Sequence, residues 1–286
     1  MRWTAALLLL VGPVLAAPDI DRLRSRGHSG LGPLLALADS ADPDVRLRAR
    51  RAAKEIALEV MRARTPEGMR LVPGRLGVSA SAVRSEGGLY LSTHEVTRAE
   101  WRKFVLAVRK RREVKPLTAA EGGFPATRVS HKDALDYARW KGARLPTFDE
   151  LVFAMTAGGR LVYPWGNVFD PRCANTPKGG VGKPEPVGSR PRGRSPHGVE
   201  DLVGNVAEWT STPRGAHRLI AGGSWKTELS REHKPTYSLY PEASGLDIGF
   251  RLAKSLEPVL PLPEPKPSEP GRERRPAAEE SKSGAD

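Results

Sequence analysis

One segment of the sequence combines acidic side chains with a glycine turn, a pattern that suits the binding of a cation. Asp201 and Glu208 stand near the two ends of the run DLVGNVAEW, residues 201–209. Carboxylates and main-chain carbonyls are the oxygen donors that a hard cation such as calcium prefers. From the residues alone, capping or ion pairing in a tight turn is the simpler interpretation of the two acids.

Cysteine chemistry is limited, because the chain contains 1 Cys, Cys173. No disulfide can form within the chain, so its stability must come from packing or from a bound metal. A single cysteine without an obvious partner behaves most often as a small buried hydrophobe, and we expect this role for Cys173.

The first residues have the pattern of a cleaved secretory signal. Arg2 precedes an apolar run at 5–10, and small residues at 14–17 form a cleavage site. The apolar run is too short to span a bilayer and is interrupted by glycine and proline at 12–13. We therefore expect residues 1–17 to be removed, leaving a secreted or periplasmic protein with no transmembrane segment.

The formal net charge of +13 narrows the choice of partners only slightly. The arginines are scattered along the chain and form no basic stripe with interleaved aromatic residues, so we expect no nucleic-acid binding. A basic surface does favour association with the acidic polymers or lipids of a cell envelope, although this attraction is unspecific.

Three regions follow the signal. Residues 18–66 have helical apolar spacing, with Asp42 and Pro43 as the cap and first residue of a long helix, and they resemble one HEAT-type pair. One such pair cannot bury its own apolar face, so it must pack on the next domain or on a partner. Residues 67–255 combine short strands with glycine turns. Residues 256–286 are rich in proline and charge, and we expect them to be disordered.

The middle region contains three predicted helix starts of one kind. In each, a serine or threonine precedes an acidic residue by three positions, which is the spacing of a capping box. The pairs are Thr97 and Glu100, Ser130 and Asp133, and Thr147 and Glu150.

Six short motifs of the middle region resemble the landmarks of the sulfatase-modifying-factor family, also called the formylglycine-generating-enzyme family. They are EVT at 95–97, RLPTFDE at 144–150, YPWG at 163–166, GNVAEW at 204–209, GGSW at 222–225 and GFR at 249–251. The resemblance implies an α+β fold similar to that of C-type lectins, with much irregular loop. It also implies that the four motif tryptophans, Trp140, Trp165, Trp209 and Trp225, are core or loop-anchoring residues.

The resemblance assigns a calcium site to the loop described first. The matching positions are Asp201 and Glu208, by their side chains, and Gly204 and Val206, by their main-chain carbonyls. With the family as context, calcium becomes the preferred interpretation of this loop.

A second calcium site of the family would begin at Asn175 and Thr176. The segment that should supply its later ligands is shortened here, and Glu185 is the only acidic candidate in it. Nearby lysines oppose a cation, so we expect this second site to be lost or much weakened.

The chain departs from the family where oxidation would occur. Family enzymes that convert a cysteine to formylglycine place two copper-binding cysteines after GGSW, and these positions are Thr227 and Glu232 here. Cu(I) requires soft thiolate ligands, so we expect neither copper nor this oxidase activity. Relatives that hold non-haem iron carry histidines in an H-x-x-x-H-x-E run, and the chain has no such run.

Two functions of different class remain. The first is an exported binding or structural module, stabilised by calcium, with a protein or glycan ligand and possible envelope association. The second is an enzyme of the same family with altered chemistry, which would use groups such as Glu232 and His233 beside the former thiol positions.

Overall fold

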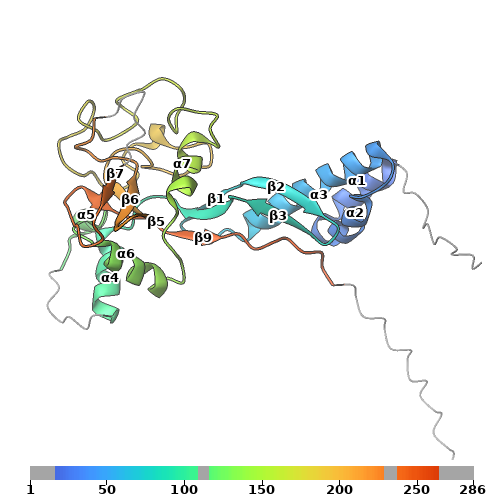
Figure 1. The fold of residues 1–286 in the computed structure, drawn as a ribbon, viewed down its shortest axis with the longest axis horizontal. Coiled ribbons are helices and arrows are strands. Elements are labelled where there is room, and N and C mark those ends of the chain that lie inside the picture. Colours follow the sequence, from blue (N-terminus) through green and yellow to red (C-terminus); the bar gives the residue numbers. More distant parts are fainter. Residues whose placement is uncertain (1–16, 109–115, 229–236, 264–286) are drawn as a thin grey trace, which may run out of the picture.

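The computed structural model describes residues 17–108, 116–228 and 237–263. The described chain has two parts, which Figure 1 shows at opposite ends of an elongated molecule. A helical unit lies at one end and a larger mixed body at the other, and strands β1, β2, β3 and β9 lie between them. Residues 1–16 of the predicted signal, Glu232, His233 and residues 264–286 fall outside the described residues, whereas Ala17 is described.

The helical unit contains three α-helices, where the sequence suggested two. Helix α1 (Ala17–Ser25) leads through the short 3-10 helix η1 (Gly27–Gly30) to α2 (Leu31–Leu37), and α3 (Pro43–Ala63) follows. The chain turns between α1 and α2 at Gly27, whose φ of +58° an L side chain rarely adopts. Asp42 caps α3 as predicted, since its Oδ1 accepts from the Asp44 N–H at 2.9 Å.

The apolar face of the helical unit packs on another part of the same chain. Hairpin β2 (Arg75–Ser79) and β3 (Ala82–Glu86) lies against α3, and Val83 joins its hydrophobic core. Val83 also pairs with Val259, exchanging main-chain hydrogen bonds of 3.0 and 2.9 Å, and both side chains are fully buried. The first of the two alternatives, packing on the neighbouring region, is therefore the one observed.

The packed chain extends beyond the predicted start of the tail at residue 256. Val259 lies in the core of the helical unit, and the main-chain carbonyl of Leu260 is 2.6 Å from Nε2 of His28. Residues 256–263 are thus part of the described structure, and Val259 packs with the hairpin residue Val83 in the core of the helical unit.

The body contains two sheets. Strands β1 (Met69–Val72), β4 (Leu89–Ser92) and β9 (Ala253–Ser255) form an antiparallel sheet in the order β1-β4-β9. The other sheet has the order β7-β6-β5-β8, with β5 (Ala207–Arg214), β6 (His217–Ala221), β7 (Tyr237–Leu239) and β8 (Ile248–Gly249). Strands β5 and β8 are parallel, and this pairing brings the GFR motif beside the end of the acidic loop.

Helices α4 (Arg98–Val108), α5 (Ala119–Gly122), α6 (His131–Trp140) and α7 (Phe148–Thr156) complete the body, with a short 3-10 helix η2 (Pro191–Gly193). All three predicted capping boxes are present. The hydroxyls of Thr97, Ser130 and Thr147 accept from the main-chain N–H three residues later at 3.1 to 3.2 Å. A long irregular segment joins α7 to β5, so the architecture is the predicted α+β fold with much loop.

The core of the body is aromatic. Trp209 and Phe250 are fully buried, and Tyr137 contacts Phe250 edge-on with ring centroids 5.3 Å apart. Trp140 differs from the prediction: 42% of it is exposed, because it lies at the end of α6, where its ring contacts Phe104 and Tyr137 at the edge of the core. None of the described helices is both long and apolar enough to cross a membrane.

Candidate cation site in a buried acidic loop

The loop before β5 is a strained turn that faces inward. Asp201, Gly204 and Asn205 all have positive φ, at 51°, 83° and 58°. At Gly204 a side chain would have no room, since a Cβ atom there would lie 2.5 Å from the main-chain oxygen of Asn175. Strain of this kind persists only where surrounding contacts fix the backbone, and it is frequent at functional sites.

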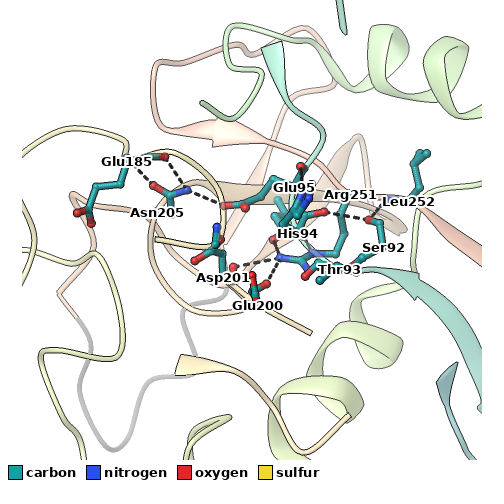
Figure 2. Close-up of polar contacts among 12 residues, drawn as sticks. Ser92, Thr93, His94, Glu95, Glu185, Glu200, Asp201, Asn205, Arg251 and Leu252 are labelled. Carbon is teal, nitrogen blue, oxygen red and sulfur yellow. Dashed lines mark hydrogen bonds and ion pairs between the residues drawn. The ribbon is translucent and has the colours of Figure 1, made fainter. Parts of the chain in front are cut away.

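Asn205 fixes this loop from its centre, as Figure 2 shows. Its Oδ1 accepts from the Glu185 N–H at 2.9 Å and from Asn175 Nδ2 at 3.2 Å. Its Nδ2 donates to Glu95 Oε1 at 3.0 Å. One amide thus holds together the EVT motif, the acidic loop and the irregular segment before it.

Arg251 of the GFR motif binds the same region from the other side. Its Nε and Nη2 donate to the two carboxylate oxygens of Glu208, at 2.7 and 2.6 Å. The guanidinium also donates to main-chain carbonyls around it, as seen in Figure 2, and these belong to Ser92, Thr93, Glu200 and Asp201. All three nitrogens of the Arg251 guanidinium therefore donate hydrogen bonds inside the protein.

Three carboxylates surround this single guanidinium. Glu95 and Glu208 are buried, and Asp201 Oδ2 accepts from the Gly188 N–H at 2.6 Å. Burial raises the pKa of all three acids, and for Glu95, whose pKa is raised well above its usual range, the neighbouring Asp201 adds to the effect. Ionised together, the three acids exceed the positive charge of Arg251 by two.

Several oxygens near the acids have no protein partner. Glu95 Oε2 is buried and, among the described residues, makes no hydrogen bond. Within the same described part of the chain, no donor reaches the main-chain carbonyls of Gly204 and Val206 or Oδ1 of Asp201. Oxygens left open beside excess negative charge are the donors that calcium prefers.

The four residues assigned to calcium thus fit this ion by chemistry. Asp201 and Glu208 would contribute carboxylate oxygens, and Gly204 and Val206 would contribute carbonyls. Both oxygens of Glu208 already accept from Arg251, but a carboxylate offers about four lone-pair directions and can serve a cation as well. In the described residues no three histidine, cysteine or acidic side chains converge on one metal position, so carbonyls would have to complete the ligand set.

Glu95 and Arg251 were not among the residues predicted for the site. Both belong to motifs that carried the family resemblance, EVT and GFR, and Arg251 is a charged residue inside an otherwise apolar stretch. A charged side chain is rarely buried without a partner, so this pattern was the available signal. The sequence separation of 156 positions between them, which follows from their numbers, hid the contact.

The position of the second family site, which we expect to be lost or much weakened, has open oxygens of its own. Asn175 Oδ1 and Thr176 Oγ1 are buried without a hydrogen-bond partner among the described residues. Glu185, the only acidic candidate for that site, is paired with Arg190, with Nε to Oε2 at 2.8 Å.

The described part of the former thiol region is polar. Thr227 Oγ1 accepts from the Ser224 N–H at 3.0 Å, and the two hydroxyl oxygens are 3.2 Å apart. Nζ of Lys226 lies 3.4 Å from Oδ1 of Asp247 and forms an ion pair with it. Cys173 is buried elsewhere in the body, and burial followed by the charge of Asp170 raises the pKa of its thiol.

Comparison with known proteins gives sequence matches over the body of the chain. Residues 60–256 match the family model described as the sulfatase-modifying factor enzyme 1-like domain. The chain is 36% identical over 151 residues to the inactive C-alpha-formylglycine-generating enzyme 2 of Bos taurus, a match that covers 46% of this chain and 50% of the bovine protein. It is 39% identical over 113 residues to the formylglycine-generating enzyme of Mycobacterium tuberculosis, covering 36% and 38%. The chain therefore spans half or less of the length of these relatives.

A solved structure supports the fold. The crystal structure of CarF superimposes with a TM-score of 0.53 at 19% sequence identity, covering 67% of this chain and 99% of that one. At this identity the likeness establishes the architecture alone.

Proposed function

The chain belongs to the sulfatase-modifying factor enzyme 1-like family, and from this premise we propose that it is an exported, calcium-stabilised binding or structural module without thiol-dependent oxidase activity. A protein or glycan outside the cytoplasm would be its ligand. The chain would keep the scaffold of the family and its cation loop, and it lacks the pair of thiols.

One observation carries the non-catalytic part of the proposal: the whole chain contains 1 Cys. A copper site made of two thiolates needs two cysteines, and hard hydroxyl or carboxylate oxygens do not replace them for Cu(I). Thr227, at the first of these positions, instead hydrogen-bonds with Ser224. The remaining thiol, that of Cys173, is buried with a raised pKa, which disfavours the reactive thiolate.

The calcium part of the proposal is supported by the donor set and by charge. Asp201, Glu208 and the carbonyls of Gly204 and Val206 would hold the ion. A bound divalent cation would supply positive charge to a buried group of three acids that has one arginine, Arg251, in its midst. Its role there is structural: it would fix a loop whose backbone is already strained.

The alternative is an enzyme of the same family with altered chemistry. It is favoured by the polar cluster of Ser224, Lys226, Thr227 and Asp247, which lies in and beside the GGSW segment. Ser224 is however fully buried, so it is not presented to a substrate. We therefore place the binding module first.

An oxidation assay tests the choice. The purified mature chain is incubated with copper, oxygen and a sulfatase-type cysteine peptide, and the peptide mass is followed. We expect no conversion, and the double variant Thr227→Cys with Glu232→Cys, assayed for copper binding, is the comparison. Formylglycine produced by the unaltered chain would overturn the non-catalytic proposal.

A further inference from the structure

A hollow of about 380 Å³ lies where the helical unit, β1 and the loops of the body meet. This volume is within the range of about 300 to 1,000 Å³ typical of small-molecule sites. Its walls come from three separate segments, and the lining residues that concern us are Arg62, Thr65, Met69, Arg70, Pro196 and His197.

The hollow is positively charged. Arg62 and Arg70 have no acidic partner in the described part of the chain, and Arg70 donates only to the main-chain oxygen of Met69, at 3.0 Å. Arg70 reaches over the turn at 195–198, because its Nε lies 3.2 Å from where a Cβ on Gly198 would be. No acidic residue lines the hollow, so no carboxylate in its walls compensates the charge of its two guanidinium groups.

His197 also lines the hollow. Its Nε2 is shielded from solvent and has no hydrogen-bond partner among the described residues, so an oxygen in the open hollow does not reach this atom. Burial, and after it the charge of Arg160, lowers the pKa of His197.

We propose that this hollow binds a phosphate or sulfate group, carried by a small organic molecule or present as the free ion. The planar forks of Arg62 and Arg70 match the oxygens of such a tetrahedral anion, which accepts paired hydrogen bonds from guanidinium groups. The apolar walls at Met69 and Pro196 leave room for the organic part of an ester.

Binding at this place connects the two parts of the molecule. Arg62 belongs to the last turn of α3 in the helical unit, Arg70 to β1, and His197 to an irregular loop of the body. An anion held by Arg62 and Arg70 fixes the helical unit against β1. The site is separate from the acidic loop and needs no calcium.

Calorimetric titration of the full mature chain tests the proposal. The titrants are inorganic phosphate, inorganic sulfate, glucose 6-phosphate and glucose 6-sulfate, with chelator present and with ionic strength matched by sodium chloride. We expect saturable binding of one anion per chain. Arg62→Gln and Arg70→Gln should each weaken it by about tenfold or more, since a hydrogen bond to a charged group contributes at least that factor.

The matched control is Arg64→Gln, which removes the same charge from an exposed arginine two residues from Arg62 but outside the lining. It should change the affinity less than threefold, as expected for an unspecific charge effect at a surface. Arg70→Lys, which keeps the charge but loses the planar fork, provides a second site variant should Arg70→Gln fail to fold, as judged by circular dichroism.

The outcomes are distinct. Tighter binding of the esters than of the free ions, lost in the Arg62 and Arg70 variants, assigns the site to an organic phosphate or sulfate. Equal binding of ions and esters, lost in the same variants, assigns it to the free anion. Absence of saturable binding for all four titrants, or equal weakening by Arg64→Gln, overturns the proposal.

Discussion

Arg251 and Glu208 form a bidentate ion pair inside the body, with Nη2 to Oε1 at 2.6 Å and side-chain exposures of 0% and 2%. Burying two charges is costly, and the cost is offset only where the remaining donors and acceptors are satisfied. Here the other donors of Arg251 reach main-chain carbonyls of β4 and of the acidic loop, among them that of Ser92 at 3.2 Å. The ion pair thus connects β5 to β4 and to the acidic loop.

The first prediction concerns this pair. Arg251→Met should lower the free energy of unfolding by about 3–5 kcal/mol, because it leaves Glu208 buried without its partner. Arg251→Lys is the control, since it keeps the charge but loses the fork, and its loss should be smaller. Urea denaturation at pH 7 measures both. A change of less than about 1 kcal/mol for Arg251→Met would contradict the assigned role.

The second prediction concerns calcium. Chelation should lower the melting temperature of the mature chain, because a ligand that binds only the native state at 100 times its Kd adds about 2.7 kcal/mol of stability. Asp201→Ala should remove most of the difference between the calcium and chelator melts. Asp201 is a cleaner test than Glu208, whose removal would also leave Arg251 unpaired.

Asp170→Ala is the matched control for calcium. Its carboxylate is paired with Arg172 at 2.8 Å, outside the acidic loop. This variant should keep the full difference between the two melts. Identical melts of the unaltered chain with and without chelator would refute the calcium site.

Local features of the fold were predictable from the sequence. The cap at Asp42 and the capping boxes beginning at Thr97, Ser130 and Thr147 depend on residues three or fewer positions apart, so the sequence contains all the information that they need. The motif order then indicated the α+β body, and the family match over residues 60–256 confirms that assignment.

Contacts between distant segments were not predictable in the same way. Val83 and Val259 are ordinary apolar residues, and nothing near either one shows that they pair across the helical unit. For the candidate site, the acids at 201 and 208 were visible as a local pattern. The inward positions of Glu95 and Arg251 depend on the pairing of β4 with β9 and of β5 with β8, which a local pattern does not specify.

The third prediction uses the Val83–Val259 contact. A chain ending at residue 263 should melt like the full mature chain, whereas one ending at residue 256 should melt at a lower temperature. The shorter chain loses the buried Val259 side chain, worth about 1.5–3 kcal/mol when fully buried, and two main-chain hydrogen bonds to Val83.

Val259→Thr in the longer chain provides the comparison for this truncation. It keeps the chain length and the main-chain pairing but places a hydroxyl in an apolar core, so it should reproduce part of the loss. Equal melting temperatures for the chains ending at 256 and 263 would show that the segment contributes no stability.

The fourth prediction is a pH dependence. Burial, and after it the charge of Asp201, raises the pKa of Glu95 well above its usual range. A carboxyl group with a raised pKa binds its proton more tightly in the folded state. Its contribution to stability is therefore complete below the unfolded pKa of about 4.3 and is lost as the pH rises through the folded pKa.

Glu95→Gln should remove this dependence without removing the side chain's volume. Its amide oxygen can still accept from Asn205 Nδ2, the 3.0 Å contact of the native residue. In chelator, the melting temperature of the unaltered chain should fall relative to that of the variant between pH 5 and pH 8. Asp201 and Glu208 also have raised pKa values, so the variant should reduce the slope but not abolish it.

Calcium should reduce the difference between the two chains, because a nearby cation favours the ionised carboxylate. Parallel melting curves across this pH range would show that Glu95 does not change its protonation on unfolding.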